Sequence, residues 1–293
     1  IAYRSAELAR GVGDDESAPY SVMAADRFET VHADSTHGEI LTAGRLLRRD
    51  GSTIAKFEQR YQLWRGSRIL LVDVRLQLDE EPAADPWNSY YALRFAWGDE
   101  TADLYQTLHE SRQRVGSGKF ESPLYVDVIL DDKRTTILTG GLPFHRRVGM
   151  NMLDSLLITR GEQCRHFQFG IGLDLQQPLH DARALLTGPT WIRSRPGPLR
   201  SSQHGWLFHL DNRQVVATHL EPIVQDGSVR GMRMRLLEST GRAARVTVSA
   251  FRPVQSAKQT NFLGEELAEC GLENGRVRVE LAGHEWVQLE AYW

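Results

Sequence analysis

The 293-residue sequence has only two cysteines, no long apolar run and no excess of charge of one sign. Cys164 and Cys270 are far apart and form no C-x-x-C pair, so we expect two buried thiols rather than a disulfide framework or a zinc knuckle. No segment approaches the roughly 18 to 20 apolar residues of a membrane-spanning helix. The net charge of −3 provides no positive field for nucleic acid or anionic lipid. We therefore expect neither nucleic acid nor a membrane as a partner.

Generic catalytic motifs are also absent. The sequence contains no P-loop, no Rossmann glycine fingerprint, no H-E-x-x-H and no G-x-S-x-G. Two histidine pairs, His32 with His37 and His204 with His209, are each five residues apart. Side chains at that spacing point to opposite faces of a strand, so each pair converges only through a loop or bulge. The residue pattern alone therefore selects no catalytic residue and no metal ligand.

What the sequence does contain is alternation of apolar and polar residues with a period of two, which is typical of strands with one buried face. Predicted strands lie at 68–78, 90–97, 230–236, 246–248, 276–281 and 287–293. Turn pairs such as Asn274-Gly275 separate them, and helical periodicity is limited to 179–186 and 263–268. Asp73, inside the first strand, has Arg75 as a partner on the same face. The sequence predicts an all-β protein of antiparallel sheets.

Glycine and proline are concentrated at 187–202, where they interrupt both helix and sheet formation. We therefore place a domain boundary in this segment. The first part is too long for one simple sheet, whereas the last part has the size of a small sandwich. The sequence predicts a large β-supersandwich over residues 1–195 and a smaller antiparallel β-sandwich over residues 196–293.

The segment 85–91 combines aromatic, amide and hydroxyl groups at the start of a predicted strand. Trp87, Tyr90 and Tyr91 are the aromatic residues of this mixture, which suits stacking on a sugar face and hydrogen bonding to its hydroxyls. The structural alternative is that the three rings belong to the core and edge of a sandwich. Both interpretations remain open from the sequence.

The segment 139–147 forms the second candidate, because two glycines and a proline shape a loop ahead of His145, Arg146 and Arg147. Arginine suits forked recognition of polar groups. The structural alternative is an exposed loop with solvated charges. We take His145, Arg146 and Arg147, together with the three aromatic residues, as candidate substrate-binding residues.

Three runs of the sequence, 57–66, 85–97 and 134–147, resemble the C-terminal β region of glycoside hydrolase family 38, the α-mannosidases. The run 234–242 resembles the strand and turn that begin the terminal β-sandwich of that family, and 261–265 resembles its following turn. The resemblance extends over most of the chain. It is carried by structural segments rather than by catalytic motifs.

The resemblance implies a context for this chain. Members of the family join a zinc-containing α/β catalytic domain and a helical bundle to a β-supersandwich of galactose-mutarotase-like type and smaller β units. Their nucleophilic aspartate and zinc ligands lie upstream, and no segment here matches those motifs. The resemblance therefore implies no catalytic residue and no cofactor in this fragment, with zinc in the missing catalytic domain. The implied partners are the upstream catalytic and helical domains of the same parent chain, with carbohydrate as a further candidate.

Three hypotheses about function follow. In the first, a parent α-mannosidase hydrolyses α-mannosides with retention, and this chain contributes domain docking and a wall of the sugar cleft. In the second, the chain is a free-standing carbohydrate-binding module with Trp87, Tyr90 and Tyr91 as its stacking platform. In the third, it is a mutarotase-like epimerase that uses His145, or His109 with Glu110, as acid and base.

Overall fold

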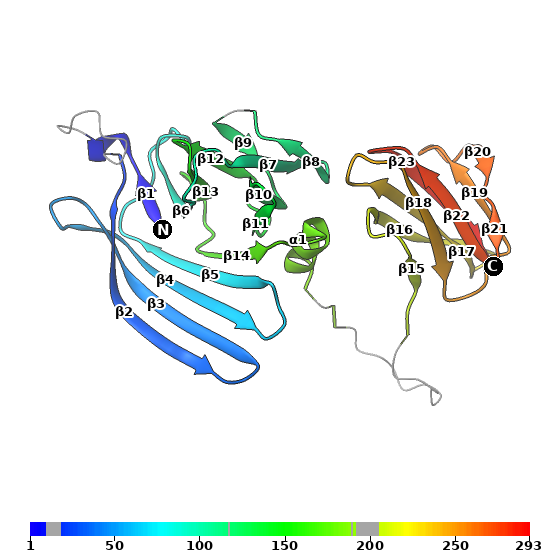
Figure 1. Ribbon diagram of the computed structural model, residues 1–293, viewed down its shortest axis with the longest axis horizontal. Helices are drawn as coiled ribbons and strands as arrows, with labels where there is room; N and C mark the ends of the chain where they lie inside the picture. The colour runs from blue at the N-terminus through cyan, green and yellow to red at the C-terminus, as the bar shows by residue number, and fades with distance from the viewer. Residues whose placement is uncertain (10–18, 117, 189, 192–204) are drawn as a thin grey trace. The chain divides into compact units, whose positions relative to one another are not determined.

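The computed structural model describes residues 1–9, 19–116, 118–188, 190–191 and 205–293, and within them the protein is all-β apart from two short helices (Figure 1). The chain divides into two compact units, Ile1–Pro189 and Thr190–Trp293. This division falls within the glycine- and proline-rich segment. The predicted border between residues 195 and 196 lies outside the described residues.

The first unit contains two antiparallel sheets, here named sheets I and II. Sheet I contains, in spatial order, β1 (Ala2–Arg4), β6 (Tyr90–Ala96), β13 (Met152–Ile158), β12 (Phe144–Val148) and β9 (Lys119–Glu121). Sheet II contains β2 (Val22–Ala33), β3 (His37–Leu47), β4 (Thr53–Trp64), β5 (Ile69–Leu78), β14 (His166–Leu173), β11 (Lys133–Leu138), β10 (Tyr125–Leu130), β7 (Asp103–Leu108) and β8 (Ser111–Arg114). The helices are a 3-10 helix, η1 (Ala6–Ala9), and α1 (Pro178–Leu186). Figure 1 shows the long strands β2 to β5 side by side.

The core of the first unit lies between sheets I and II. Leu93 and Leu153 contribute from sheet I, and Val74 and Phe169 contribute from sheet II. The ring of Phe95 packs at 5.9 Å between centroids against that of Phe169, which connects the two layers. These residues share the apolar parity of their strands, so the alternation seen in the sequence builds this core.

The second unit is a smaller sandwich of sheets III and IV. Sheet III contains β15 (Phe208–Leu210), β18 (Ala244–Ala250), β22 (Arg276–Leu281) and β21 (Leu272–Glu273). Sheet IV contains β16 (Val215–Gln225), β17 (Ser228–Glu238), β23 (Trp286–Tyr292), β19 (Ser256–Thr260) and β20 (Glu266–Glu269). Val246 and Val279 from sheet III meet Met234 and Leu289 from sheet IV in a fully buried core.

Each predicted strand is present, and so is the helix predicted at 179–186, where Leu179 and Ala182 are buried. Asn274 and Gly275 have φ values of +51° and +70° and connect β21 to β22, as the turn chemistry predicts. Within the described residues, no helix is long and apolar enough to cross a membrane. Cys164 and Cys270 are free thiols, but the expected burial is wrong, because Cys164 is exposed in the loop before β14 and Cys270, between β20 and β21, is only partly buried.

The helix predicted at 263–268 is wrong, because its second half belongs to strand β20. Asn261 Oδ1 accepts hydrogen bonds from the backbone N–H groups of Leu263 and Glu265, and Gly264 has φ +92°. This turn reverses the chain, so that β20 pairs with β19. The pairing partner is supplied by another strand, and a short window of sequence carries no signal for it.

Candidate functional site

Trp87 and Arg146 lie together on the outer face of sheet I, although 58 residues separate them in the sequence. Arg146 Nη1 donates a 2.6 Å hydrogen bond to the carbonyl oxygen of Trp87 and lies 3.4 Å from Asn88 Oδ1. The ring of Phe144 meets the Trp87 ring edge-on at 6.1 Å, and Lys119 Nζ lies 5.3 Å from the Trp87 ring centroid. We call these five residues the Trp87 surface. They combine aromatic, amide and cationic groups in one place.

A turn centred on Asp85 holds the loop that carries Trp87. Asp85 Oδ1 accepts a 3.0 Å hydrogen bond from the Trp87 backbone N–H, and Oδ2 accepts one of 2.8 Å from Asn88 Nδ2. These hydrogen bonds, that from the Asn88 side chain first, lower the pKa of the Asp85 carboxyl. The Asx turn therefore fixes Trp87 and Asn88 at the entrance to β6.

Tyr90 belongs to a buried polar network on the same face of sheet I. Its hydroxyl donates a 2.7 Å hydrogen bond to Asp154 Oδ2, which also accepts one of 3.0 Å from Tyr20. Arg94 donates two hydrogen bonds to the Asp154 carboxylate, at 2.7 and 3.1 Å. Burial, reinforced by the charge of Asp154, raises the pKa of Tyr90. Tyr90 has no exposed surface and supports the sheet instead of contacting a ligand.

Tyr91 points to the opposite side, into the core between sheets I and II. Its ring stacks on Tyr3 at 4.5 Å, and its hydroxyl donates a 2.7 Å hydrogen bond to the carbonyl oxygen of Glu80. Its side chain is fully buried. Of the three aromatic residues considered as a platform, Trp87 alone is partly exposed.

His145 is completely buried beneath sheet I. Its Nε2 lies 3.0 Å from the carbonyl oxygen of Ser122, which can only accept, so this nitrogen carries the proton. Nδ1 then accepts a hydrogen bond from the Ser155 hydroxyl at 3.0 Å. Burial lowers the pKa of His145 to about 4. Both ring nitrogens are engaged, so His145 is a neutral structural residue with no free nitrogen for acid–base chemistry.

The remaining candidates do not converge with His145. Arg147 is half-buried and donates a 2.8 Å hydrogen bond from Nη2 to the carbonyl oxygen of Met150. His109 and Glu110 form the two-residue turn between β7 and β8, with φ values of +49° and +63°. Glu110 makes an ion pair with Arg183 of α1. The β7–β8 turn is thus held to α1 through Glu110.

His32 and His37 do meet, because the β2–β3 hairpin folds one back on the other. Their rings stack at 5.3 Å, and His37 stacks on Trp64 at 4.1 Å. His32 Nε2 lies 2.9 Å from Asp34 Oδ2. No group of three or more His, Cys, Asp or Glu side chains in the described part of the chain could hold a metal ion. His204 lies outside the described residues, so the structure does not test whether it meets His209.

Phe144 and Lys119 complete the Trp87 surface, and neither is among the residues predicted from the sequence. Phe144 was detectable in principle, because it lies two residues before Arg146 on β12 and so shares its face. Lys119 was not, because its proximity depends on the pairing of β9 with β12. The surface hollows are likewise not predicted from the sequence, because each is assembled from separate strands and loops.

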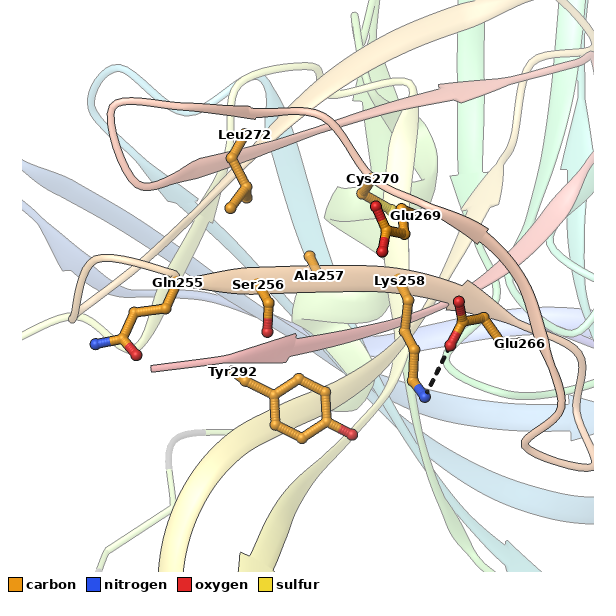
Figure 2. A pocket seen from close by; sticks show the side chains of 9 residues that line it. All are labelled: Gln255, Ser256, Ala257, Lys258, Glu266, Glu269, Cys270, Leu272 and Tyr292. Atoms are coloured by element: carbon orange, nitrogen blue, oxygen red, sulfur yellow. Dashed lines mark hydrogen bonds and ion pairs between the residues drawn. The ribbon is translucent and has the colours of Figure 1, made fainter.

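The first hollow lies in the second unit and has a volume of about 380 Å³ (Figure 2). It is lined by Gln255, Ser256, Ala257, Lys258, Glu266, Glu269, Cys270, Leu272 and Tyr292. Lys258 Nζ is 3.4 Å from Glu266 Oε2, and the Tyr292 hydroxyl donates a 2.8 Å hydrogen bond to Glu290. Lys258 and Glu266 thus already have each other as partners.

Glu238 explains why the run 234–242 is a recognisable motif. Its fully buried carboxylate accepts hydrogen bonds from the backbone N–H groups of Thr240, Gly241 and His284, at 2.9, 2.7 and 3.1 Å. Burial acts to raise the pKa of Glu238, but the Thr240 hydroxyl and these N–H groups outweigh it and lower the pKa. Glu238 therefore joins the β17–β18 turn to the β22–β23 turn. The role is structural.

Comparison with solved structures places this fold among known proteins. An α-mannosidase from Enterococcus faecalis V583 matches with a TM-score of 0.70 and 13% sequence identity, over 92% of this chain and 35% of that chain. A glycosyl hydrolase family 38 protein from Enterococcus faecalis matches with a TM-score of 0.69 and 14% identity, over 92% of this chain and 36% of that one.

The chain thus spans about a third of the length of these proteins. No protein-family model and no curated protein matches it. At 13% and 14% identity, the likeness is one of fold. The sequence resemblance is confirmed at that level: this chain has the fold of the C-terminal β region of family 38 α-mannosidases.

Proposed function

We propose that this chain is the β region of a family 38 α-mannosidase and supports the hydrolysis of α-mannosides by a zinc-containing catalytic domain elsewhere in the same polypeptide. The observation that carries the proposal is the match over 92% of this chain to only about a third of an α-mannosidase. The remainder of such a protein has to include other domains, and the reactive groups belong there. In this proposal zinc and the nucleophilic carboxylate are upstream, and the present chain holds neither.

Docking is the first role that we assign to the chain. Strands β2 and β4 expose large apolar side chains, including Phe28 with 71%, Trp64 with 50% and Leu63 with 47% of their surface accessible. β3 lies between these two strands, so the exposed side chains gather in one part of sheet II, and exposed apolar patches of this kind mark interaction sites. The other domains of a polypeptide about three times as long would cover them, with a gain in free energy from buried apolar area.

The Trp87 surface is the part of the chain that we assign to the wall of the sugar cleft. Trp87 and Phe144 supply aromatic carbon, which packs on the apolar face of a sugar ring. Arg146 uses one N–H on the Trp87 carbonyl, and the guanidinium has five N–H donors in all. Asn88 is exposed and offers an amide beside it. These residues would bind and orient sugar hydroxyls, while bond cleavage would occur on the catalytic domain.

Turnover of an aryl α-mannoside tests this proposal. The present chain alone should show none, whereas the polypeptide extended upstream through its catalytic domain should be active. Deletion of the present chain from that polypeptide should abolish activity or solubility. Robust turnover by the isolated chain would show that the roles are wrongly assigned, and so would an upstream reading frame without zinc and nucleophile motifs.

A free-standing carbohydrate-binding module is the second candidate, and the exposure of Phe144 beside Trp87 is the observation that favours it. Specific saccharide binding by the chain, lost in Trp87→Ala without unfolding, would support this function over docking. The epimerase hypothesis has no such support. His145 is enclosed, and Glu110 is paired with Arg183.

A further inference from the structure

A second hollow, of about 460 Å³, lies on the first unit, where β5 and β14 run side by side in sheet II. It is lined by Asp73, Gly140, Gly141, Leu142, Glu162, Cys164, His166, Phe167 and Gln168. We call it the Asp73 hollow. Asp73 and Gln168 are directly paired across the two strands and occupy the face opposite to the core residues Val72 and Phe169. The hollow therefore opens on the outer face of sheet II, and its volume is in the range of small-molecule sites.

Asp73 and His166 are the central polar groups of this hollow. His166 Nε2 lies 3.1 Å from Asp73 Oδ1, and a carboxylate oxygen only accepts, so Nε2 carries the proton. In neutral His166 this leaves Nδ1 as an acceptor. Neither Nδ1 nor Asp73 Oδ2 has a hydrogen-bond partner among the described residues. The hydrogen bond between His166 and Asp73 thus orients both side chains and leaves His166 Nδ1 and Asp73 Oδ2 for a ligand.

Gln168 and Glu162 add further unused groups. The side-chain amide of Gln168 is exposed and makes no hydrogen bond with any described residue. Glu162 uses Oε1 to accept a 2.7 Å hydrogen bond from the Cys164 backbone N–H, and no described residue bonds to Oε2. The hollow therefore presents oriented acceptors together with one group, the Gln168 amide, that both donates and accepts.

Two glycines form one rim of the hollow. Gly140 has φ +60°, and a Cβ atom there would lie 1.9 Å from the Gln168 carbonyl oxygen. Gly141 has φ +89°. Only glycine allows the backbone to lie this close to β14 in this conformation. The glycine-rich segment 139–147 thus borders this hollow, while His145 from the same segment is buried.

The lining groups restrict the class of ligand. None of the lining residues is Lys or Arg, so an anion would face two carboxylates without a compensating charge. No metal-holding group of three occurs among the described residues, which excludes a cation site built on Asp73, Glu162 and His166. The single aromatic lining residue, Phe167, is a core residue with 7% exposure and offers no stacking face. A neutral ligand that carries several hydroxyl donors fits the acceptors best.

We propose that the Asp73 hollow binds a saccharide through neighbouring hydroxyl groups, with Asp73, Glu162 and Gln168 as the hydrogen-bonding residues. Each sugar hydroxyl both donates and accepts, which matches two carboxylate acceptors beside one amide. His166 positions the Asp73 carboxylate, and its Nδ1 accepts a hydrogen bond from a further sugar hydroxyl. The inference rests on residues of the first unit alone and does not depend on the proposed role in a mannosidase.

Titration of the full chain with methyl α-D-mannopyranoside and methyl β-D-galactopyranoside tests the proposal, with ligand-observed NMR and calorimetry as readouts. We expect saturable binding of at least one glycoside. Gln168→Ala and Asp73→Asn should each weaken it by about tenfold or more, as loss of a hydrogen bond to a charged or oriented group does. Both sites are on the solvent side of the sheet, and an unchanged unfolding midpoint will show that the fold is intact.

Gln77→Ala is the matched control, because Gln77 is exposed on the same face of β5 and does not line the hollow. Its affinity should equal that of the unaltered chain. Failure of both glycosides to bind overturns the proposal. Binding lost in Trp87→Ala but kept in Gln168→Ala also overturns it, because the sugar would then occupy the Trp87 surface. Saturable binding of butylammonium or Ca²⁺ in place of the glycosides would assign the hollow to cations and contradict the inference.

Discussion

The Tyr90 hydroxyl donates a 2.7 Å hydrogen bond to Asp154 Oδ2 on the outer face of sheet I, where neither side chain has accessible surface. Tyr20 covers this pair, with its ring 3.6 Å from the Arg94 guanidinium carbon. Tyr90, a candidate for sugar stacking from the sequence, therefore serves as a structural partner of the buried Asp154 carboxylate. Its removal should affect folding and leave ligand binding alone.

Tyr90→Phe should lower the free energy of unfolding by about 1.5 to 3 kcal/mol, because a hydrogen bond to a buried charged group is lost. Urea unfolding followed by tryptophan fluorescence measures the change. Saccharide binding, where present, should be unaltered by this substitution. A variant that keeps full stability and loses sugar affinity would contradict the structural role. Tyr105→Phe, on a half-buried ring of sheet II whose hydroxyl has no hydrogen bond among the described residues, is the matched control.

The burial of His145 predicts a loss of stability in mild acid. Its pKa is about 4 in the folded chain, against about 6.5 when unfolded. Between these values the unfolded chain binds one more proton than the folded chain, so stability falls as the pH drops from about 6.5 to about 4. The total contribution is about 3 kcal/mol.

Denaturant unfolding at pH 7 and pH 4.5, at constant ionic strength, measures this dependence. His145→Asn should flatten the slope in that window, although the variant will be less stable at pH 7. An equal slope in the chain with and without His145 would show that the imidazole is not kept neutral by burial.

Glu238→Gln should destabilise the second unit by about 2 to 3 kcal/mol. The substitution replaces one carboxylate oxygen with an NH₂ group that faces backbone N–H donors, and it removes the charge that strengthens the remaining hydrogen bonds. Scanning calorimetry measures the shift, and Glu269→Gln at an exposed position is the control. Equal melting temperatures of the two variants would show that Glu238 does not stabilise the contact between the two turns.

Gly140→Ala should be more destabilising than Gly161→Ala. Both glycines have positive φ, so each substitution costs about 1 to 2 kcal/mol of backbone strain. At Gly161 a Cβ atom would meet nothing within 4 Å, whereas at Gly140 it would collide with the Gln168 carbonyl oxygen. The difference between the two unfolding free energies isolates that collision. Equal values would mean that the loop at Gly140 does not lie against β14.

Local pattern accounts for much of this fold. Strand β5 follows from the alternation in 68–78, and the β21–β22 turn follows from Asn274-Gly275, because both depend on residues adjacent in the chain. The segment 263–268 shows the limit of this reasoning. Its short apolar spacing suits a helix, but pairing with β19 makes its second half a strand.

The candidate site depended more on distant contacts. Alternation placed Tyr91 with Leu93 on the apolar side of β6, and both are buried. The alternation does not predict that Tyr20 and Trp87 cover Tyr90 on the other face of β6. The strand pattern predicts Arg75, two residues away, as the partner of Asp73, whereas the hydrogen bond of Asp73 is to His166, 93 residues away.

The sequence by itself determined the all-β class, the positions of the main strands and the resemblance to the β region of α-mannosidases. Only the tertiary structure decided which polar and aromatic side chains reach solvent and which atoms meet across sheets. The reason is physical: a period of two assigns residues to faces, whereas burial depends on what packs over a face, and that covering comes from segments far away in the chain.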